Sequence, residues 1–174
     1  MAIPQTVPSA GVEVQGGAKE IVTGGVVAGI IGGMLMAMIM MMATAAGGMG
    51  FLAPLRLIAA TFYGKNAMTG DGPLIVGLMI HMMNSIVLGM IFAWIAGRRL
   101  PAVQALMAGV AFSLAIWAVM TFGGLPMLNP IMRERVAMMP VTWFIAHLAF
   151  GMGVGSAPRL RRRSVAHFTP GSSR

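Results

Sequence analysis

The apolar run from Pro73 to Arg99 constrains the fold of this chain more than any other feature. Its residues 74–96 carry no charge and are long enough for one α-helix to cross the roughly 30 Å hydrocarbon core of a bilayer. The run begins at a proline, ends at two arginines and contains one histidine, His81. An imidazole inside such a segment needs hydrogen-bonding partners. The sequence therefore predicts a membrane-spanning helix with one polar residue whose role must be explained.

The composition is that of a chain whose surface faces lipid. Hydrophobic residues make up 57% and charged residues only 9%, against about 25% charged in an ordinary soluble domain. Three further apolar runs cover residues 21–46, 102–122 and 141–157. With residues 74–96 they predict an all-α, integral membrane four-helix bundle. The last run is short for a span.

The remaining segments are tails or short interfacial elements. Residues 1–18 are rich in Pro and Gly and are expected to form a flexible tail, residues 19–158 the four-span membrane domain, and residues 159–174 a basic tail. The segments 51–63 and 131–139 carry arginines and are too short to span. We expect them to form short interfacial helices on the non-cytoplasmic side of the membrane.

The positive charge indicates membrane topology. The formal net charge is +8, and the basic residues stand at the ends of apolar runs, as topology signals do. We therefore expect no nucleic-acid partner, and a multi-pass protein of the cell membrane with both termini in the cytoplasm. Arg98 and Arg99 close the second span. Arg161, Arg162 and Arg163 follow the fourth, as a stop signal with a solvated tail or as a contact for anionic lipid.

The first apolar run contains a ladder of small residues. Gly25, Gly29 and Gly33 recur every four residues and share one helix face. In lipid, where apolarity gives helices no reason to associate, small residues let two backbones approach closely. The ladder predicts a face for helix packing or oligomerisation.

The two halves of the chain have a similar plan, which favours two tandem two-helix repeats. Each half has Ala-Gly early in its first span, a Gly-Gly exit, an interfacial segment, and a span that opens with proline and carries a histidine. The paired positions are Ala28-Gly29 with Ala108-Gly109, Gly47-Gly48 with Gly123-Gly124, and His81 with His147. Small residues follow each histidine at i+4 and i+8: Ser85 and Gly89, then Gly151 and Gly155.

Three roles are open for the two histidines. In the structural one, each imidazole bonds a backbone carbonyl or a neighbour such as Asn84, Ser85, Ser113 or Thr142. In the second, His81 and His147 are the axial ligands of a haem b, and the small residues make room for the macrocycle. In the third, the imidazoles respond to protons or contact a quinone carbonyl.

Metal handling and transport are further alternatives. Many methionines cluster in the first span, and Met82 and Met83 follow His81. Thioethers bind Cu(I), so copper handling is one alternative, although these residues face every side of a helix. A small transporter is also open. The chain has no cysteine, no paired carboxylates and no nucleophile motif, so we expect a non-enzymatic protein without thiolate metal sites.

The segments HMMNSIVLG and HLAFGMGVG resemble those of small bacterial four-span proteins of the YagU-like kind, over residues 21–160. This resemblance implies a membrane location and no functional residue. Our leading hypothesis is an accessory or assembly subunit of a larger membrane complex. Its expected partners are the lipid bilayer and other membrane subunits or further copies of itself.

Overall fold

The part of the chain that the structure describes folds around four long helices. The computed structural model describes residues 17–96 and 100–157, and within these ranges it contains helices and no strand. The long helices are α1 (Gly17–Ala46), α3 (Gly72–Ala96), α4 (Ala102–Val119) and α7 (Pro140–Gly155). The predicted all-α fold is confirmed. Most of both predicted tails, and Arg98, Arg99, Arg161, Arg162 and Arg163, lie outside the described residues.

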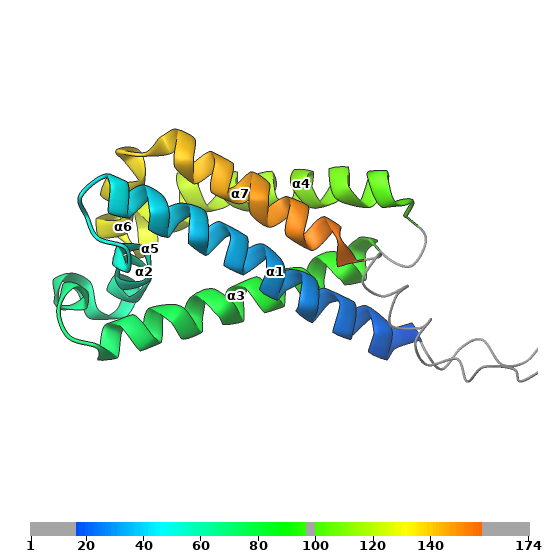
Figure 1. The fold of residues 1–174 in the computed structure, drawn as a ribbon, viewed down its shortest axis with the longest axis horizontal. Helices are drawn as coiled ribbons and strands as arrows, with labels where there is room; N and C mark the ends of the chain where they lie inside the picture. Colours follow the sequence, from blue (N-terminus) through cyan, green and yellow to red (C-terminus); the bar gives the residue numbers. More distant parts are fainter. Residues whose placement is uncertain (1–16, 97–99, 158–174) are drawn as a thin grey trace, which may run out of the picture.

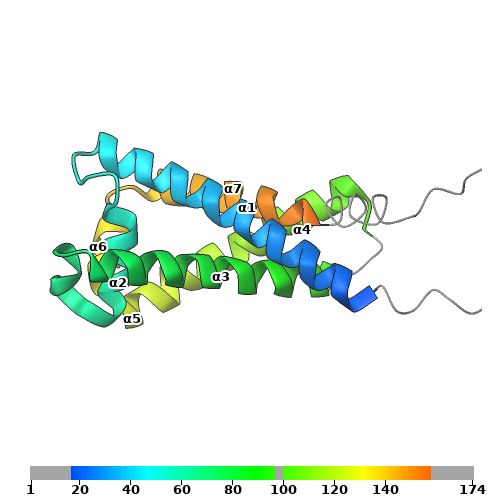
Figure 2. The same ribbon diagram turned by 60° about the horizontal axis from the view of Figure 1, so that its bottom comes forward.

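The long helices pack in the order α3, α1, α7, α4, with α1 and α7 as the inner pair (Figure 1). The packing is extensive between α1 and α3, between α1 and α7, and between α4 and α7, whereas α3 and α4 touch little. α1 begins and α7 ends at the same end of the molecule (Figure 2). The bundle therefore has one weakly packed side, between α3 and α4.

Three helical segments are long and apolar enough to cross a membrane: Ile21–Ala46, Gly72–Ala96 and Ala102–Leu128. A fourth is possible if Pro130–Ala137 and Pro140–Gly155, which meet at 102°, are taken as one bent span. α7 alone has 16 residues and is about 24 Å long.

The third span differs from the prediction. The sequence predicted that Gly123-Gly124 would end the helix near residue 122, but the helix continues as a π-helical turn, Met120–Gly124, into α5 (Leu125–Leu128). Pro126 cannot donate a backbone hydrogen bond. A wider π-turn just before it changes the bonding pattern and lets the helix continue.

One end of the bundle carries a cap of short elements: α2 (Ala53–Tyr63), η1 (Gly64–Met68), α5 and α6 (Pro130–Ala137), as Figure 1 shows. The buried Asn129 joins its two parts. Its Nδ2 donates to the carbonyl of Leu57 at 2.8 Å and to the Thr61 hydroxyl at 2.9 Å, while its Oδ1 caps α6 by accepting from the N–H of Met132. The two predicted interfacial segments thus form one layer.

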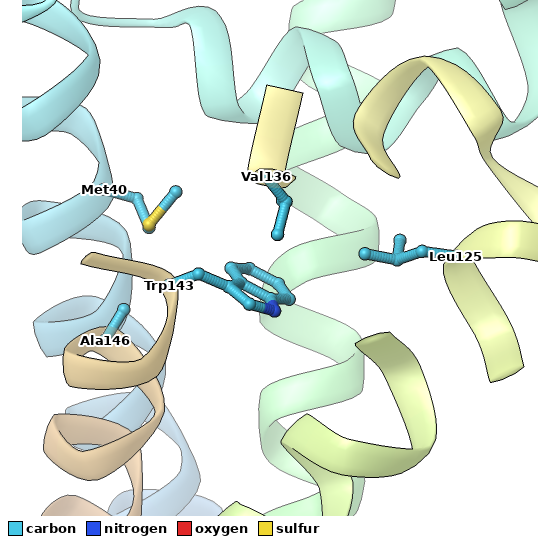
Figure 3. Close-up of a cluster of buried hydrophobic side chains, with 5 residues drawn as sticks. All are labelled: Met40, Leu125, Val136, Trp143 and Ala146. Carbon is cyan, nitrogen blue, oxygen red and sulfur yellow. The ribbon is translucent and has the colours of Figure 1, made fainter. Parts of the chain in front are cut away.

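Between the cap and the bundle lies the cluster shown in Figure 3, which surrounds the buried indole of Trp143. Its other members come from α1, α5, α6 and α7: Met40, Leu125, Val136 and Ala146. The indole N–H of Trp143 donates to the Thr121 hydroxyl, at 2.9 Å, inside the π-turn. This cluster fixes the cap on the outer turns of the long helices.

Candidate functional site

The predicted glycine ladder of α1 packs against α3. A Cβ added to Gly25 would lie 2.8 Å from the Cα of Met90, and one added to Gly29 would overlap the backbone at Ser85. On the facing helix, a Cβ on Gly89 would overlap the backbone of Gly25 and Gly29. Only glycine fits at these positions without a shift, so α1 and α3 are in backbone contact.

The α4–α7 pair packs in the same way. A Cβ on Gly151 would lie 2.7 Å from the Cα of Val110, and one on Gly155 2.8 Å from the Cα of Leu106. Opposite them, a Cβ on Gly109 would lie 2.7 Å from the Cα of Gly155. Gly151 and Gly155 therefore form a helix-packing surface against α4.

A third glycine contact joins the two pairs. A Cβ on Gly153 of α7 would overlap the backbone of Gly32 of α1, and one on Gly32 would lie 2.8 Å from the Phe150 carbonyl oxygen. The sequence interpretation missed both residues. The signal was the adjacent pair Gly32-Gly33, which supplies small residues to two faces of α1 at once.

His81 bonds the backbone of α1. Its Nε2 lies 2.9 Å from the carbonyl oxygen of Gly33, and because that oxygen only accepts, Nε2 carries the proton. The imidazole is half-buried. Ser85, one turn on, donates to the carbonyl oxygen of His81 itself at 2.8 Å.

His147 bonds its own helix. Its Nδ1 donates to the carbonyl oxygen of Trp143 at 2.9 Å, and the two rings meet edge to face with centroids 4.4 Å apart. The side chain is 3% exposed. Ser113 of α4 donates to the His147 carbonyl oxygen at 2.6 Å. The two histidines thus carry their protons on different ring nitrogens.

The arrangement does not fit a bis-histidine haem. The Nε2 of His81 is engaged by the Gly33 carbonyl, and the small residues expected to leave room for a macrocycle face helix backbone instead. Gly89 meets α1, while Gly151 and Gly155 meet α4. His81 and His147 are therefore not arranged as the two axial ligands of a haem.

The methionines of α1 do not converge on one point. Met34, Met38 and Met42 are exposed on the outer face of the helix, whereas Met40 is buried under the cap. Within the described ranges, no group of three or more His, Cys, Asp or Glu side chains could hold a metal ion. The Met-rich segment lies against the bundle on one side and is open on the other.

Asn84 is a functional candidate of a different kind. It stands at the midpoint of α3, twelve residues from Gly72 and twelve from Ala96, and its side chain is exposed. The sequence interpretation considered it only as a partner for the histidines. A carboxamide on the outside of a helix at mid-membrane depth is costly unless another molecule supplies hydrogen bonds.

One polar atom inside the bundle also has no partner. Nε1 of Trp117 is buried without a hydrogen bond within the described part of the chain. Its ring packs edge to face against Phe122 and Phe144, with centroids 5.9 and 5.3 Å away. The aromatic neighbours account for its position, and an apolar environment leaves the indole N–H unpaired.

Together these features define a class: an all-α membrane protein whose long helices are joined through glycine contacts and closed at one end by a short-helix cap. The chain belongs to the family described as "Family of unknown function (DUF6789)", which matches residues 19–167. No curated protein and no solved structure matches it.

Proposed function

We propose that the protein is a non-enzymatic accessory or assembly subunit of a larger complex in the cell membrane. Asn84 is the observation that carries this proposal. Its exposed carboxamide lies at the centre of α3, a span of mean hydropathy 2.1. In that environment an unpaired amide favours association with a partner that can bond it. The position of the basic residues supports a topology with both termini in the cytoplasm.

The interior of the bundle offers a complementary argument. His81, His147, Ser85 and Ser113 all bond backbone carbonyls. The spaces beside the glycines are filled by neighbouring helices. Such an interior serves packing, so the surfaces that face outwards are the ones available for function.

We further propose that the two halves descend from an internal repeat and that the family is related to the YagU-like membrane proteins. A constant offset of 66 residues takes His81, Ser85 and Gly89 to His147, Gly151 and Gly155, and one of 80 residues takes Gly29 and Gly33 to Gly109 and Ser113. Residues paired by these offsets make equivalent interhelical contacts. This agreement supports the repeat.

The competing functions are electron transfer and copper handling or transport. Electron transfer through a quinone is compatible with the present bonds of the histidines, whereas a haem would require His81 Nε2 to leave the Gly33 carbonyl. The quinone role has one specific support, because each histidine keeps a ring nitrogen with a free lone pair: Nδ1 of His81 and Nε2 of His147.

Purification in a mild detergent separates these functions. The full-length protein, extracted from its native membrane and weighed by native mass spectrometry, is expected to be heavier than one chain and to show no Soret or quinone absorption. A mass of one chain would refute the subunit function. A chromophore band that disappears in His81→Ala or His147→Ala would support electron transfer instead.

A further inference from the structure

We infer that the partner of α3 is a second copy of this chain, held by Asn84 against Asn84 across a twofold axis normal to the membrane. This inference rests on the proposed function and names the partner. The surface in question, called here the Asn84 seam, consists of Ile80, Asn84, Val87 and Ile91. Asn84 is exposed, Val87 and Ile91 are 43% and 41% exposed, and Ile80 is half-buried.

The spacing of the seam is that of a two-helix interface. Its residues follow one another at intervals of four, three and four, so they form one narrow stripe along α3. Branched aliphatic side chains flank one central asparagine. In paired helices a single asparagine in such a stripe fixes register and favours a specific oligomer. The Asn84 seam has both components.

The equivalent stripe on α7 shows what such a face normally meets. The offset of 66 takes the Asn84 seam to Ala146, Phe150, Gly153 and Ala157, and all four are buried. Their neighbours include Met40, Gly32 and Ala28, all on α1. One half of the molecule thus covers this face with a helix, and the other half leaves it open.

In a strict repeat, α4 would cover the Asn84 seam as α1 covers α7. In the structure α4 does not reach it. The contact between α1 and α7 depends on Gly32 and Gly153. At the matching positions α4 has Phe112 and α3 has Val87, whose side chains prevent a backbone contact. Phe112 packs instead against Phe92, nearer the end of α3, with ring centroids 5.6 Å apart, and against the cluster that Phe92 forms with Phe150 and Val154 of α7. The middle of α3 remains free for a helix from outside the chain.

A second copy suits Asn84 better than an unrelated helix does. A carboxamide both donates and accepts, so two of them related by a twofold axis bond each other reciprocally. Two copies in one membrane also bring the amide to the same depth without further requirement. Among the long-helix side chains whose exposure the structure describes, the other exposed polar ones are Thr23 and Gln104, and both lie near helix ends, where the headgroup region and water can serve them.

Cysteine cross-linking tests the interface directly, because the chain contains no cysteine. Ile80→Cys, Val87→Cys and Ile91→Cys are each introduced into the full-length protein and oxidised in native membranes. We expect covalent dimers at all three positions. Met79→Cys is the matched control: it is adjacent to Ile80 at the same depth, is 66% exposed, and points to another side of α3. It should cross-link at least tenfold less.

The role of the amide is tested in the Val87→Cys background. Adding Asn84→Leu should lower the dimer yield several-fold, whereas Asn84→Gln, which keeps a carboxamide, should retain most of it. Gln104→Leu removes an exposed amide from the end of α4 and should change nothing. Leucine suits a lipid-facing position, so the variant is expected to fold, and circular dichroism checks this.

The outcomes separate the inference from the proposed function. A complex heavier than one chain with no cross-link along the Asn84 seam would overturn the second copy and leave the subunit function standing. A single-chain mass would overturn both. Equal cross-linking of Met79→Cys and Ile80→Cys, or no effect of Asn84→Leu, would also overturn the inference.

Discussion

In the α1–α3 pair the serine stands on the histidine-bearing helix, as Ser85, and faces Gly33; in the α4–α7 pair it stands on the other helix, as Ser113, and faces Gly151. Both hydroxyls nevertheless donate to the carbonyl oxygen of the histidine in their own pair. The space between the helices holds one hydroxymethyl group and requires a glycine opposite. The comparison shows that the packing requires one serine facing one glycine. Either helix of the pair can carry either residue.

The two halves differ more in how they meet each other. α1 approaches α7 through Gly32 and Gly153, whereas the matching positions on α4 and α3 hold Phe112 and Val87. A strict twofold arrangement would make both contacts alike. The two side chains that stand in place of glycines keep α3 and α4 apart, whereas the two glycines let α1 and α7 meet.

The largest effect on stability should come from filling the glycine contact between α1 and α7. Gly153→Leu places a side chain where Gly32 of α1 lies, and overpacking of this kind should lower the free energy of unfolding by about 3 kcal/mol or more. Val87→Leu at the matching position of α3 is not covered by any described helix of the same chain and should change the free energy of unfolding of the single chain by less than about 0.5 kcal/mol. Unfolding in mixed detergent–SDS micelles measures both. Equal losses would show that α3 is covered in the same way as α7.

An intermediate effect should come from exchanging the serine and the glycine. Gly33→Ser alone brings its new Cβ to 2.5 Å from the Ser85 hydroxyl oxygen and should cost about 1–3 kcal/mol. Gly33→Ser with Ser85→Gly reproduces the arrangement of α4–α7 and should recover most of that loss. The same unfolding assay applies, with Ser85→Gly alone as the control. If the double variant is no more stable than Gly33→Ser, the two pairs are not interchangeable.

The smallest effect on stability should come from removing the hydroxyl group of Ser113 or of Ser85. Ser113→Ala removes a bond between two helices and should cost about 0.6–1.5 kcal/mol. Ser85→Ala removes a bond to its own helix, to a carbonyl one turn back, and should cost less. Thr23→Ala, exposed near one end of α1, serves as the reference for a surface hydroxyl. A larger loss of stability for Ser85→Ala than for Ser113→Ala would show that the bond within one helix contributes more than the bond between two helices.

Much of the helical plan could be predicted from the sequence because lipid imposes it. A run such as residues 74–96 must be helical if it crosses a bilayer. The glycine ladder of α1 likewise predicted a close contact with another helix. The partner of that ladder is less predictable. In the haem hypothesis Gly89, Gly151 and Gly155 would flank a ligand, whereas in the structure they flank helix backbone, since a missing side chain makes room for either.

The features that escaped prediction depend on helix orientation about its own axis. Asn84 and Ser85 are neighbours in sequence, yet one is exposed and the other is buried against α1. Uniformly apolar helices give little signal for which side faces inwards. The π-turn at Met120–Gly124 was missed because Gly123-Gly124 also suits a helix end.

The bonds of Asn129 have a consequence for the order in which the molecule is completed. The carbonyl of Leu57 and the hydroxyl of Thr61 leave the ribosome long before Asn129, which follows Leu57 by 72 residues. During synthesis we therefore expect α2 to form first, with the Leu57 carbonyl bonded only within its helix and the Thr61 hydroxyl served by water or headgroups. The cap locks only after α4 and the π-turn have carried Asn129 across to the same side. We therefore expect closure of that layer to follow the folding of the third span.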